Sequence, residues 1–223
     1  MHAHMHTHAH AHTHAHTHMH TCMHAHMHTH MHTQYSTCTS DDCNCAVKLY
    51  SQPNFQGHSR EVIHTQNARL ANEGFDDQAA SAKVVGTCSW LFYDGDNFAG
   101  YAYLLYPGEY YSNLAWGAQG KSLSSLRALP PQGTVAIALF DYYNFNGRMV
   151  VLQASVDKLQ TVYDFDNKAS SALVVNGTWK LYENSNYQGS SIEAAPGYHY
   201  PSGIGTLTTN RVSSIKLNHT VLN

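Results

Sequence analysis

Short runs in which apolar and polar residues alternate recur along most of the chain after residue 45. Apolar side chains at every second position of a four- to eight-residue run are typical of half-buried β-strands. Four such runs, at residues 47–49, 90–92, 135–139 and 179–181, each stand just before an aromatic residue. The pattern therefore predicts an all-β protein.

An eight-residue unit begins at each of these aromatic residues: aromatic, four residues, aromatic, one residue, glycine. The units occupy residues 50–57, 93–100, 140–147 and 182–189. Each contains Asn and Gly, which suit tight turns, and Gly takes positive φ values at which a side chain would clash. We predict that each unit is a hairpin whose two aromatic rings stack over the bend.

A serine-ended element follows each hairpin glycine after about 24 or 25 residues and leads into a further apolar strand. Its serines are Ser81, Ser124 with Ser125, Ser170 with Ser171, and Ser213 with Ser214. The four glycines are 43, 47 and 42 residues apart. Each repeat therefore has room for four short strands, which make one Greek key.

With these repeats the chain resembles the βγ-crystallin superfamily over residues 46–221, because the family repeat is marked by Tyr/Phe-x4-Phe/Tyr-x-Gly followed by a late Ser. The resemblance implies two Greek-key β-sandwich domains, 46–130 with keys 1 and 2 and 131–223 with keys 3 and 4. The Pro130-Pro131-Gln-Gly133 segment is independently typical of a linker. Residues 34–45 form a Cys-containing bridge before the first domain.

The calcium-binding branch of this family carries a loop of the form Asp/Asn-Asp/Asn-x-x-Ser/Thr-Ser in each key. The resemblance implies hard oxygen ligands for a hard cation: the acidic or amide side chains, a backbone carbonyl at the third position, and the hydroxyl at the fifth. Water and a backbone carbonyl from the hairpin of the partner key complete the set. By position in the family, the hairpin carbonyls of the second domain belong to Asp141 and Glu183.

Keys 3 and 4 match this loop best. The candidate ligands of key 3 are Asp166, Asn167, Ser170 and the backbone carbonyl of Lys168. Those of key 4 are Asn210, Ser213 and the backbone carbonyl of Arg211, with Thr209 in place of the first acid. With one carboxylate or none per loop, we expect dissociation constants of ~10⁻⁵ to 10⁻³ M.

The first domain matches less well. Key 1 keeps Asp76, Asp77 and Gln78, but Ala80 replaces the fifth-position hydroxyl, so its site is predicted to be weak. Key 2 has Gly120-Lys121 in place of the acidic pair, and we expect no calcium there. An alternative interpretation is that Asp, Asn and Ser in all four loops only cap the backbone through local hydrogen bonds.

The predicted function is calcium binding, mainly through the second domain, without catalysis. Alternatives are a structural or stress-related crystallin without a physiological calcium role, and a secreted protease-inhibitor or toxin-like module. An enzyme is disfavoured because the histidines after the N-terminal tract are scattered and no nucleophile or metalloprotease motif occurs. These histidines are His58, His64, His199 and His219.

Residues 1–33 form a low-complexity tract in which every even position is His except Cys22. Neutral imidazoles at alternate positions predict Zn²⁺, Cu²⁺ or Ni²⁺ binding in vitro. The codons of His, Cys, Thr, Ala and Met also fit one alternating purine–pyrimidine repeat, so a microsatellite origin competes with a selected metal site. In either case we expect this tract to be disordered.

A formal net charge of −3 shows no electrostatic footprint for nucleic acid. No apolar stretch of ~18 residues predicts a membrane span, and we expect a monomer. Four cysteines outside the tract, Cys38, Cys43, Cys45 and Cys88, favour an extracellular protein. Reduced thiols in a cytosolic protein are the alternative, and the disulfide pairing is open, although Cys45 and Cys88 each stand five residues before the first aromatic of a hairpin.

Overall fold

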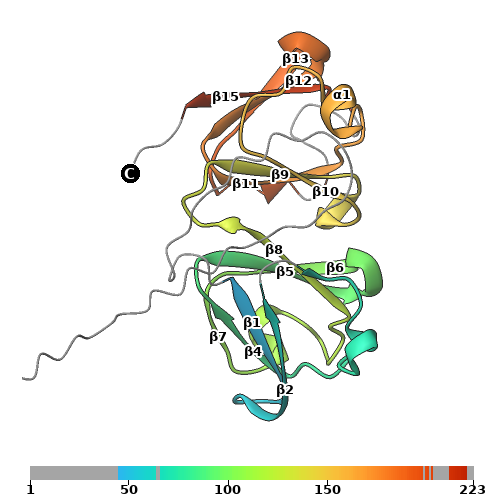
Figure 1. Cartoon of the computed structure of the whole chain (residues 1–223), viewed down its shortest axis with the longest axis vertical. Coiled ribbons are helices and arrows are strands. Elements are labelled where there is room, and N and C mark those ends of the chain that lie inside the picture. The colour runs from blue at the N-terminus through green and yellow to red at the C-terminus, as the bar shows by residue number, and fades with distance from the viewer. Residues whose placement is uncertain (1–44, 64–65, 198, 201, 203–210, 220–223) are drawn as a thin grey trace, which may run out of the picture.

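The structure, a computed structural model, describes residues 45–63, 66–197, 199–200, 202 and 211–219. Its strands form four antiparallel sheets in two domains, one above the other in Figure 1. The predicted all-β Greek-key fold is confirmed. The histidine tract, with its expected disorder, and Cys38 and Cys43 lie outside the described residues. Within these residues the helices are too short and too polar to span a membrane.

The first domain consists of two four-stranded sheets packed face to face. One sheet has the order β2 (Gln56–Ile63), β1 (Ala46–Gln52), β4 (Ser81–Val85), β7 (Gly108–Tyr110). The other has the order β3 (Gln66–Asn67), β8 (Ser125–Pro131), β5 (Cys88–Gly95), β6 (Ala99–Leu105). Three 3-10 turns connect the strands: η1 (Leu70–Glu73), η2 (Asp96–Phe98) and η3 (Asn113–Trp116). Leu49, Trp90 and Phe92 are fully buried between the two sheets.

The second domain repeats this arrangement. One sheet has the order β10 (Met149–Leu152), β9 (Ala136–Phe140), β11 (Ser171–Asn176), β14 (His199–Tyr200). The other has the order β13 (Gln188–Ala194), β12 (Thr178–Asn184), β15 (Ser214–His219), with a single bridge from Val156 to Ile215 beside it. The helical segments are α1 (Leu159–Tyr163), η4 (Tyr143–Phe145) and η5 (Ser185–Tyr187). Phe165, Trp179 and Leu181 fill the core.

Strands are exchanged between the keys of each domain. In the first domain, β3 of key 1 pairs with β8 of key 2, and β7 of key 2 pairs with β4 of key 1. In the second domain, β14 of key 4 pairs with β11 of key 3. A key therefore contributes strands to both sheets of its sandwich, which brings the connecting loops of the two keys together.

Two strands are buried on both faces because they face a core on one side and the other domain on the opposite side. Along β5, Trp90 and Phe92 face the core of the first domain, whereas Leu91 and Tyr93 face the second domain. In β9 every residue is buried, and Phe140 belongs to the cluster between the domains. This two-sided burial explains why the runs before the hairpins at residues 93 and 140 are almost continuously apolar.

Arg127 of β8 lies at the centre of the contact between the domains and is only 2% exposed. Its guanidinium donates hydrogen bonds to the Tyr93 hydroxyl (2.9 Å) and to the carbonyls of Gly147 (2.8 Å) and Phe145 (2.6 Å). Its charge also lies 4.6 Å from the ring centre of Phe98. Burial raises the pKa of the Tyr93 phenol, with Arg127 acting in the opposite direction. The phenol stays protonated and donates to the Phe145 carbonyl (2.7 Å).

The segment predicted as a linker is partly strand. β8 continues to Pro131, which pairs with Cys88 of β5. Proline is tolerated there because the pairing is irregular, with a register shift between Cys88 and Trp90 of β5. The turn toward the second domain follows, with Gly133 at a φ of 89°.

A disulfide joins Cys45 and Cys88, whose Cα atoms are 5.2 Å apart. It links β5 to the residue preceding β1, and so links key 1 to key 2. The matching positions of the second domain are Val135 and Gly177, which are in close contact: a Cβ atom built on Gly177 would lie 2.9 Å from a methyl group of Val135. The first domain thus carries a covalent bond where the second has only packing.

Candidate metal centre

The last serine of each loop fixes the hairpin of its own key. In key 3 the Ser171 hydroxyl donates to the Tyr142 carbonyl (2.6 Å) and accepts from the Phe145 N–H (3.0 Å). The same pair of bonds is made by Ser81, Ser125 and Ser214 in the other keys. This sixth-position serine is therefore engaged in holding the folded hairpin.

The hairpins need this support because their backbone enters the left-handed region. In each one an Asn and the following aromatic residue both have positive φ, for example 55° at Asn144 and 61° at Phe145. Non-glycine residues adopt such values rarely, and Asn more readily than an aromatic. The two rings of each hairpin are in contact, with centroids 5.5 to 5.8 Å apart, but they meet edge to face rather than in the predicted stack.

The first serine of the pair lies beside a hairpin carbonyl of its own key. The Ser170 hydroxyl donates to the Asp141 carbonyl (2.7 Å), and the Ser124 hydroxyl lies 3.4 Å from the Asp94 carbonyl. Each of these serines therefore contacts a hairpin carbonyl of its own key, whereas the family resemblance combines each loop with the hairpin of the partner key. The serine hydroxyl and the hairpin carbonyl, two of the oxygen types expected to bind calcium, are thus neighbours within a single key.

The side chain at the second loop position crosses to the partner key. Asn167 of key 3 has a φ of 52°, and its N–H donates to the Val212 carbonyl of key 4 (3.1 Å). Its side-chain oxygen accepts a hydrogen bond from the Ser213 hydroxyl (3.3 Å). Asn167 therefore belongs with Ser213, not with Ser170, although Ser170 is its neighbour in the sequence.

The resulting set in key 4 consists of Ser213, Asn167, and the carbonyls expected from Glu183 and Arg211. The side chains of Arg211 and Glu183 form an ion pair at the edge of this set. In key 3, Ser170 and Asp141 are in contact, and Asn210, which stands at the loop position of Asn167, lies outside the described residues. The key-4 set combines amide, hydroxyl and backbone oxygens, and the described part of the key-3 set has a hydroxyl and a backbone oxygen. Oxygens of these kinds suit calcium.

The remaining predicted residues of key 3 surround this loop. The ammonium of Lys168 bonds Asp164, at 3.0 Å from its carboxylate and 2.8 Å from its carbonyl, so its side chain is engaged away from Ser170. One Asp166 carboxylate oxygen accepts from Asn167 (3.2 Å), and the other is buried with no hydrogen bond from the described residues. The equivalent oxygen of Asp76 in key 1 is buried in the same way.

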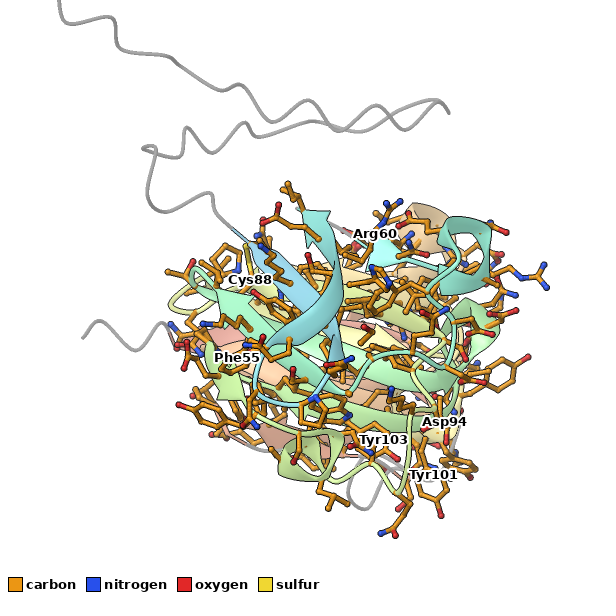
Figure 2. The ribbon with its side chains drawn as sticks, turned by 90° about the horizontal axis from the view of Figure 1, so that it is seen from below. Phe55, Arg60, Cys88, Asp94, Tyr101 and Tyr103 are labelled. Carbon is orange, nitrogen blue, oxygen red and sulfur yellow. A yellow bond between two sulfur atoms is a disulfide. The ribbon has the colours of Figure 1, made fainter. Side chains whose placement is uncertain are left out.

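In the first domain, too, the residue at the second loop position of one key contacts the loop of the partner key. A carboxylate of key 1 is thereby placed beside the oxygens of key 2. Asp77 of key 1 has a φ of 51°, and its N–H donates to the Leu123 carbonyl of key 2 (3.2 Å). It thereby stands beside the Ser124 and Asp94 pair of key 2. Figure 2 shows Asp94 at the rim of the domain beside Tyr101, whose N–H donates to the Asp94 carboxylate (2.7 Å).

Sequence reasoning missed Asp94 and Ser124 because it scored each loop alone. The available signal was positional: Asp94 directly follows the first aromatic of its hairpin, as Asp141 and Glu183 do. With Asp77 supplied by key 1, the key-2 set regains a carboxylate, despite the Gly120-Lys121 that replaces the acidic pair.

Burial raises the pKa of Asp77, and the neighbouring carboxylates of Asp76, Asp94 and Asp96 add to this effect. A raised pKa means that the folded metal-free protein disfavours the ionised form. Stability from this group is present at low pH and is lost as the pH rises through its folded pKa. A bound divalent cation would relieve the repulsion.

Asp77→Asn is therefore expected to raise the melting temperature of the metal-free protein slightly at pH 7, by about 1–2 °C, because the group is mostly exposed and screened. The difference should vanish near pH 3, where the carboxylate is protonated. Thermal unfolding in a chelator across this pH range measures it, with Asp157→Asn in the second domain as control. A lower melting temperature at pH 7 than that of the natural sequence would contradict the repulsion.

In key 1 the place of the oxygen ligands is taken by a methyl group and an ammonium. Ala80 has no hydroxyl, and the crossing residue is Lys121, whose ammonium donates to the Ser51 carbonyl (2.7 Å). Gln78 turns away and bonds the Gly74 carbonyl (2.8 Å). The residues of key 1 therefore do not fit a calcium ion.

Three or more His, Cys, Asp or Glu side chains do not gather at metal-binding distance anywhere in the described part of the chain. The candidate sets instead rest mainly on hydroxyl, amide and carbonyl oxygens. Such ligands are typical of low-affinity calcium sites rather than of zinc sites, which use nitrogen and sulfur.

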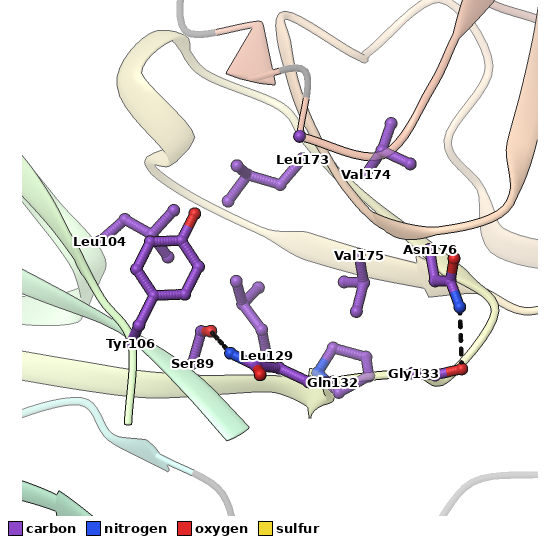
Figure 3. A pocket seen from close by; sticks show the side chains of 12 residues that line it. Ser89, Leu104, Tyr106, Leu129, Gln132, Gly133, Leu173, Val174, Val175 and Asn176 are labelled. Carbon is purple, nitrogen blue, oxygen red and sulfur yellow. Dashed lines mark hydrogen bonds between the residues drawn. The ribbon is translucent and has the colours of Figure 1, made fainter. Parts of the chain in front are cut away.

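A cavity of about 340 Å³ lies between the domains and is separate from these loops. Figure 3 shows its mixed lining, in which Leu104, Leu129 and Leu173 lie together with the polar side chains of Ser89, Gln132 and Asn176. Asn176 bonds the Gly133 carbonyl across one end (3.0 Å). Its lining carries no Asp, Glu, Lys, Arg or His side chain among the described residues.

The fold and these loops define a class, the two-domain Greek-key proteins with paired keys. The family model described as Beta/Gamma crystallin matches residues 46–129 and 136–217. The chain therefore belongs to the beta/gamma crystallin family.

Among its relatives, human Gamma-crystallin D is 29% identical over 170 residues, which cover 76% of this chain and 95% of that protein. Human Beta/gamma crystallin domain-containing protein 1 is 32% identical over 67% of this chain and 7% of that much longer protein. These relatives are crystallins or crystallin-domain proteins rather than enzymes.

Two solved structures are also similar. Geodin, a beta-gamma crystallin from Geodia cydonium, is 20% identical, covers 78% of this chain and 99% of its own, and has a TM-score of 0.61. This likeness concerns the fold alone. Protein S complexed with calcium is 21% identical over 78% of this chain and 99% of its own, with a TM-score of 0.34.

Proposed function

We propose that this protein binds calcium, mainly in its second domain, and has no catalytic activity. The observation that carries the proposal is the contact of the Ser213 hydroxyl with the Asn167 side-chain oxygen, 46 residues apart in the chain. Two oxygens of the types that calcium prefers are brought together there by the exchange between keys. Ser170 and the Asp141 carbonyl provide a second such pair in the same domain.

Key 2 is added to the proposal as a weaker site in the first domain. Its support is the approach of Asp77 to the loop that contains Ser124, with the Asp94 carbonyl alongside. Key 1 is not included.

Titration calorimetry on the full chain tests the proposal. We expect heats that fit dissociation constants of ~10⁻⁵ to 10⁻³ M. A hundredfold excess of calcium over the dissociation constant should stabilise the folded protein by about 2.7 kcal/mol. Neither heat nor a thermal shift at about 10 mM calcium, ten times the weak end of this range, would contradict the function and favour a purely structural role.

The crossing gives a sharper version of the same experiment. Asn167→Ala and Ser213→Ala should each remove calcium binding at key 4. Both variants should leave calcium binding at key 3, the key of Ser170, unchanged. Ser170→Ala should do the reverse. Asn72→Ala, in the first domain, serves as the matched control. If Asn167→Ala and Ser170→Ala removed the same site while Ser213→Ala removed another, the assignment of Asn167 to key 4 would be wrong.

An oxidising, extracellular setting is also part of this proposal. Its support is the Cys45–Cys88 disulfide, since such bonds persist in secreted proteins and are rare in reducing compartments.

A further inference from the structure

The ammonium of Lys121 lies at the position in key 1 where the other keys gather oxygen ligands. It donates to the carbonyl of Ser51 at 2.7 Å. Ser51 directly follows the first aromatic of its hairpin, so its carbonyl corresponds to that of Asp141, which meets the Ser170 hydroxyl in key 3. The contact spans 70 residues and joins key 2 to key 1.

Key 1 lacks two of the oxygen ligands that its counterpart in the second domain has, because two loop positions carry other residues. Lys121 stands at the second loop position of key 2, as Asn167 does in key 3, and its side chain crosses to the partner key in the same way. Ala80 stands at the fifth loop position of key 1, where Ser170 stands in key 3. The side-chain oxygen and the hydroxyl are therefore both absent from the same set, and an ammonium is present instead.

We propose that the Lys121 ammonium takes the place of a metal ion in key 1, so that this position is filled by a cation of the chain itself. This inference extends the proposed calcium function, because it concerns the one key that the function leaves out. An ammonium is a compact point charge with three donors. It satisfies the Ser51 carbonyl, which would otherwise face a metal ion, and its charge repels a divalent cation.

The consequence is a difference between the domains. Key 1 keeps its hairpin and the partner loop connected by a cation of the chain itself. Among the described residues of key 4, the side chains at the corresponding place, Ser213 and Asn167, are both neutral. Key 1 is then held together in the absence of calcium, while the second domain gains most of its added stability when calcium is bound.

A variant that restores the oxygen ligands tests the proposal. Lys121→Asn combined with Ala80→Ser should bind one more calcium ion per full-length chain than the natural sequence, as counted by titration calorimetry. Ala80→Ser alone is the matched control, because it adds the hydroxyl but keeps the ammonium, and its calcium count should be unchanged. If the single variant gained an ion, or the double variant gained none, the proposal would be overturned. A double variant that does not fold is replaced by Lys121→Asn alone, which removes the ammonium but still lacks the hydroxyl, and which should bind one more calcium ion with lower affinity.

A second measurement does not depend on calcium binding by the natural sequence. In a chelator, Lys121→Met should lower the melting temperature by about 1–3 °C, because an exposed charged donor to the Ser51 carbonyl is lost. Lys121→Arg, which keeps a cation, should restore most of this shift. Equal melting temperatures for the Met variant and the natural sequence would overturn the proposal. Absence of calcium heats in the natural sequence, with the Met effect present, would contradict only the proposed function.

Discussion

Replacement of both Cys45 and Cys88 by Ala is expected to destabilise the first domain by about 4 kcal/mol. The disulfide closes a loop with a sequence separation of 43 residues, and the loss of loop-closure entropy in the unfolded chain gives a value of this size. The two alanine side chains also lack the sulfur atoms and so fill less of this buried region than the cysteines do. Reduction of the natural protein should reproduce most of the effect.

Hydrogen exchange of backbone amides in a chelator separates the two domains in this experiment. Protection should fall in β1 and β5, which the disulfide joins, and change much less in β9 and β12. Val135→Ala, at the matching position of the second domain, is the control and should affect β9 and β12 instead. Equal loss of protection in both domains would show that the disulfide stabilises the protein as a whole rather than its first domain.

Ser171→Ala is expected to lower the free energy of unfolding of the second domain by about 2–3 kcal/mol. The Ser171 hydroxyl accepts a hydrogen bond from the Phe145 N–H and donates one to the Tyr142 carbonyl. The methyl group of alanine can make neither bond, so both backbone groups lose their partner. Each unsatisfied buried group costs about 1–3 kcal/mol. The backbone at Phe145, with a φ of 61°, loses a contact that holds it in the left-handed region.

Ser170→Ala is the matched control for this variant, because it lies one residue away on the same loop. The Ser170 hydroxyl donates to the Asp141 carbonyl (2.7 Å). Compared with Ser171→Ala, Ser170→Ala should therefore lower the free energy of unfolding less in a chelator and weaken calcium binding more. Denaturant unfolding with and without calcium measures both quantities. If Ser170→Ala proved the more destabilising of the two in the absence of calcium, the division of roles between the serines would be wrong.

The fold was predictable because the signals that define it are local and repeated. The alternating runs, the aromatic and glycine positions of the hairpins, and the late serines each have a direct structural cause, and their recurrence four times identified the keys. The two-sided burial of β5 was also implicit in the continuous apolar run that ends at Tyr93.

The arrangement of the candidate site was less predictable because it depends on contacts between segments that are far apart in the chain. Asn167 and Ser170 are three residues apart, yet the Asn167 side chain meets Ser213. A motif scored loop by loop assigns these residues to one ion. Only the exchange of strands between keys shows that each set draws on two loops.

Arg127 illustrates a similar limit. In the sequence it is a basic residue within an alternating strand, a pattern typical of a solvent-facing side chain. In the structure it is buried, with its charge satisfied by backbone carbonyls, a phenol and aromatic rings of both domains. The chemistry of a single position could not indicate that a second domain covers it.

The exchange of β3 and β7 between the keys of the first domain sets the smallest unit of this protein that can fold. A single key lacks the strand that its partner supplies, and its apolar face would remain uncovered. Cutting the chain between the two domains leaves each pair of keys whole. A cut within a pair leaves two fragments that need each other, so two separately expressed keys should regain the sandwich only by associating as a dimer.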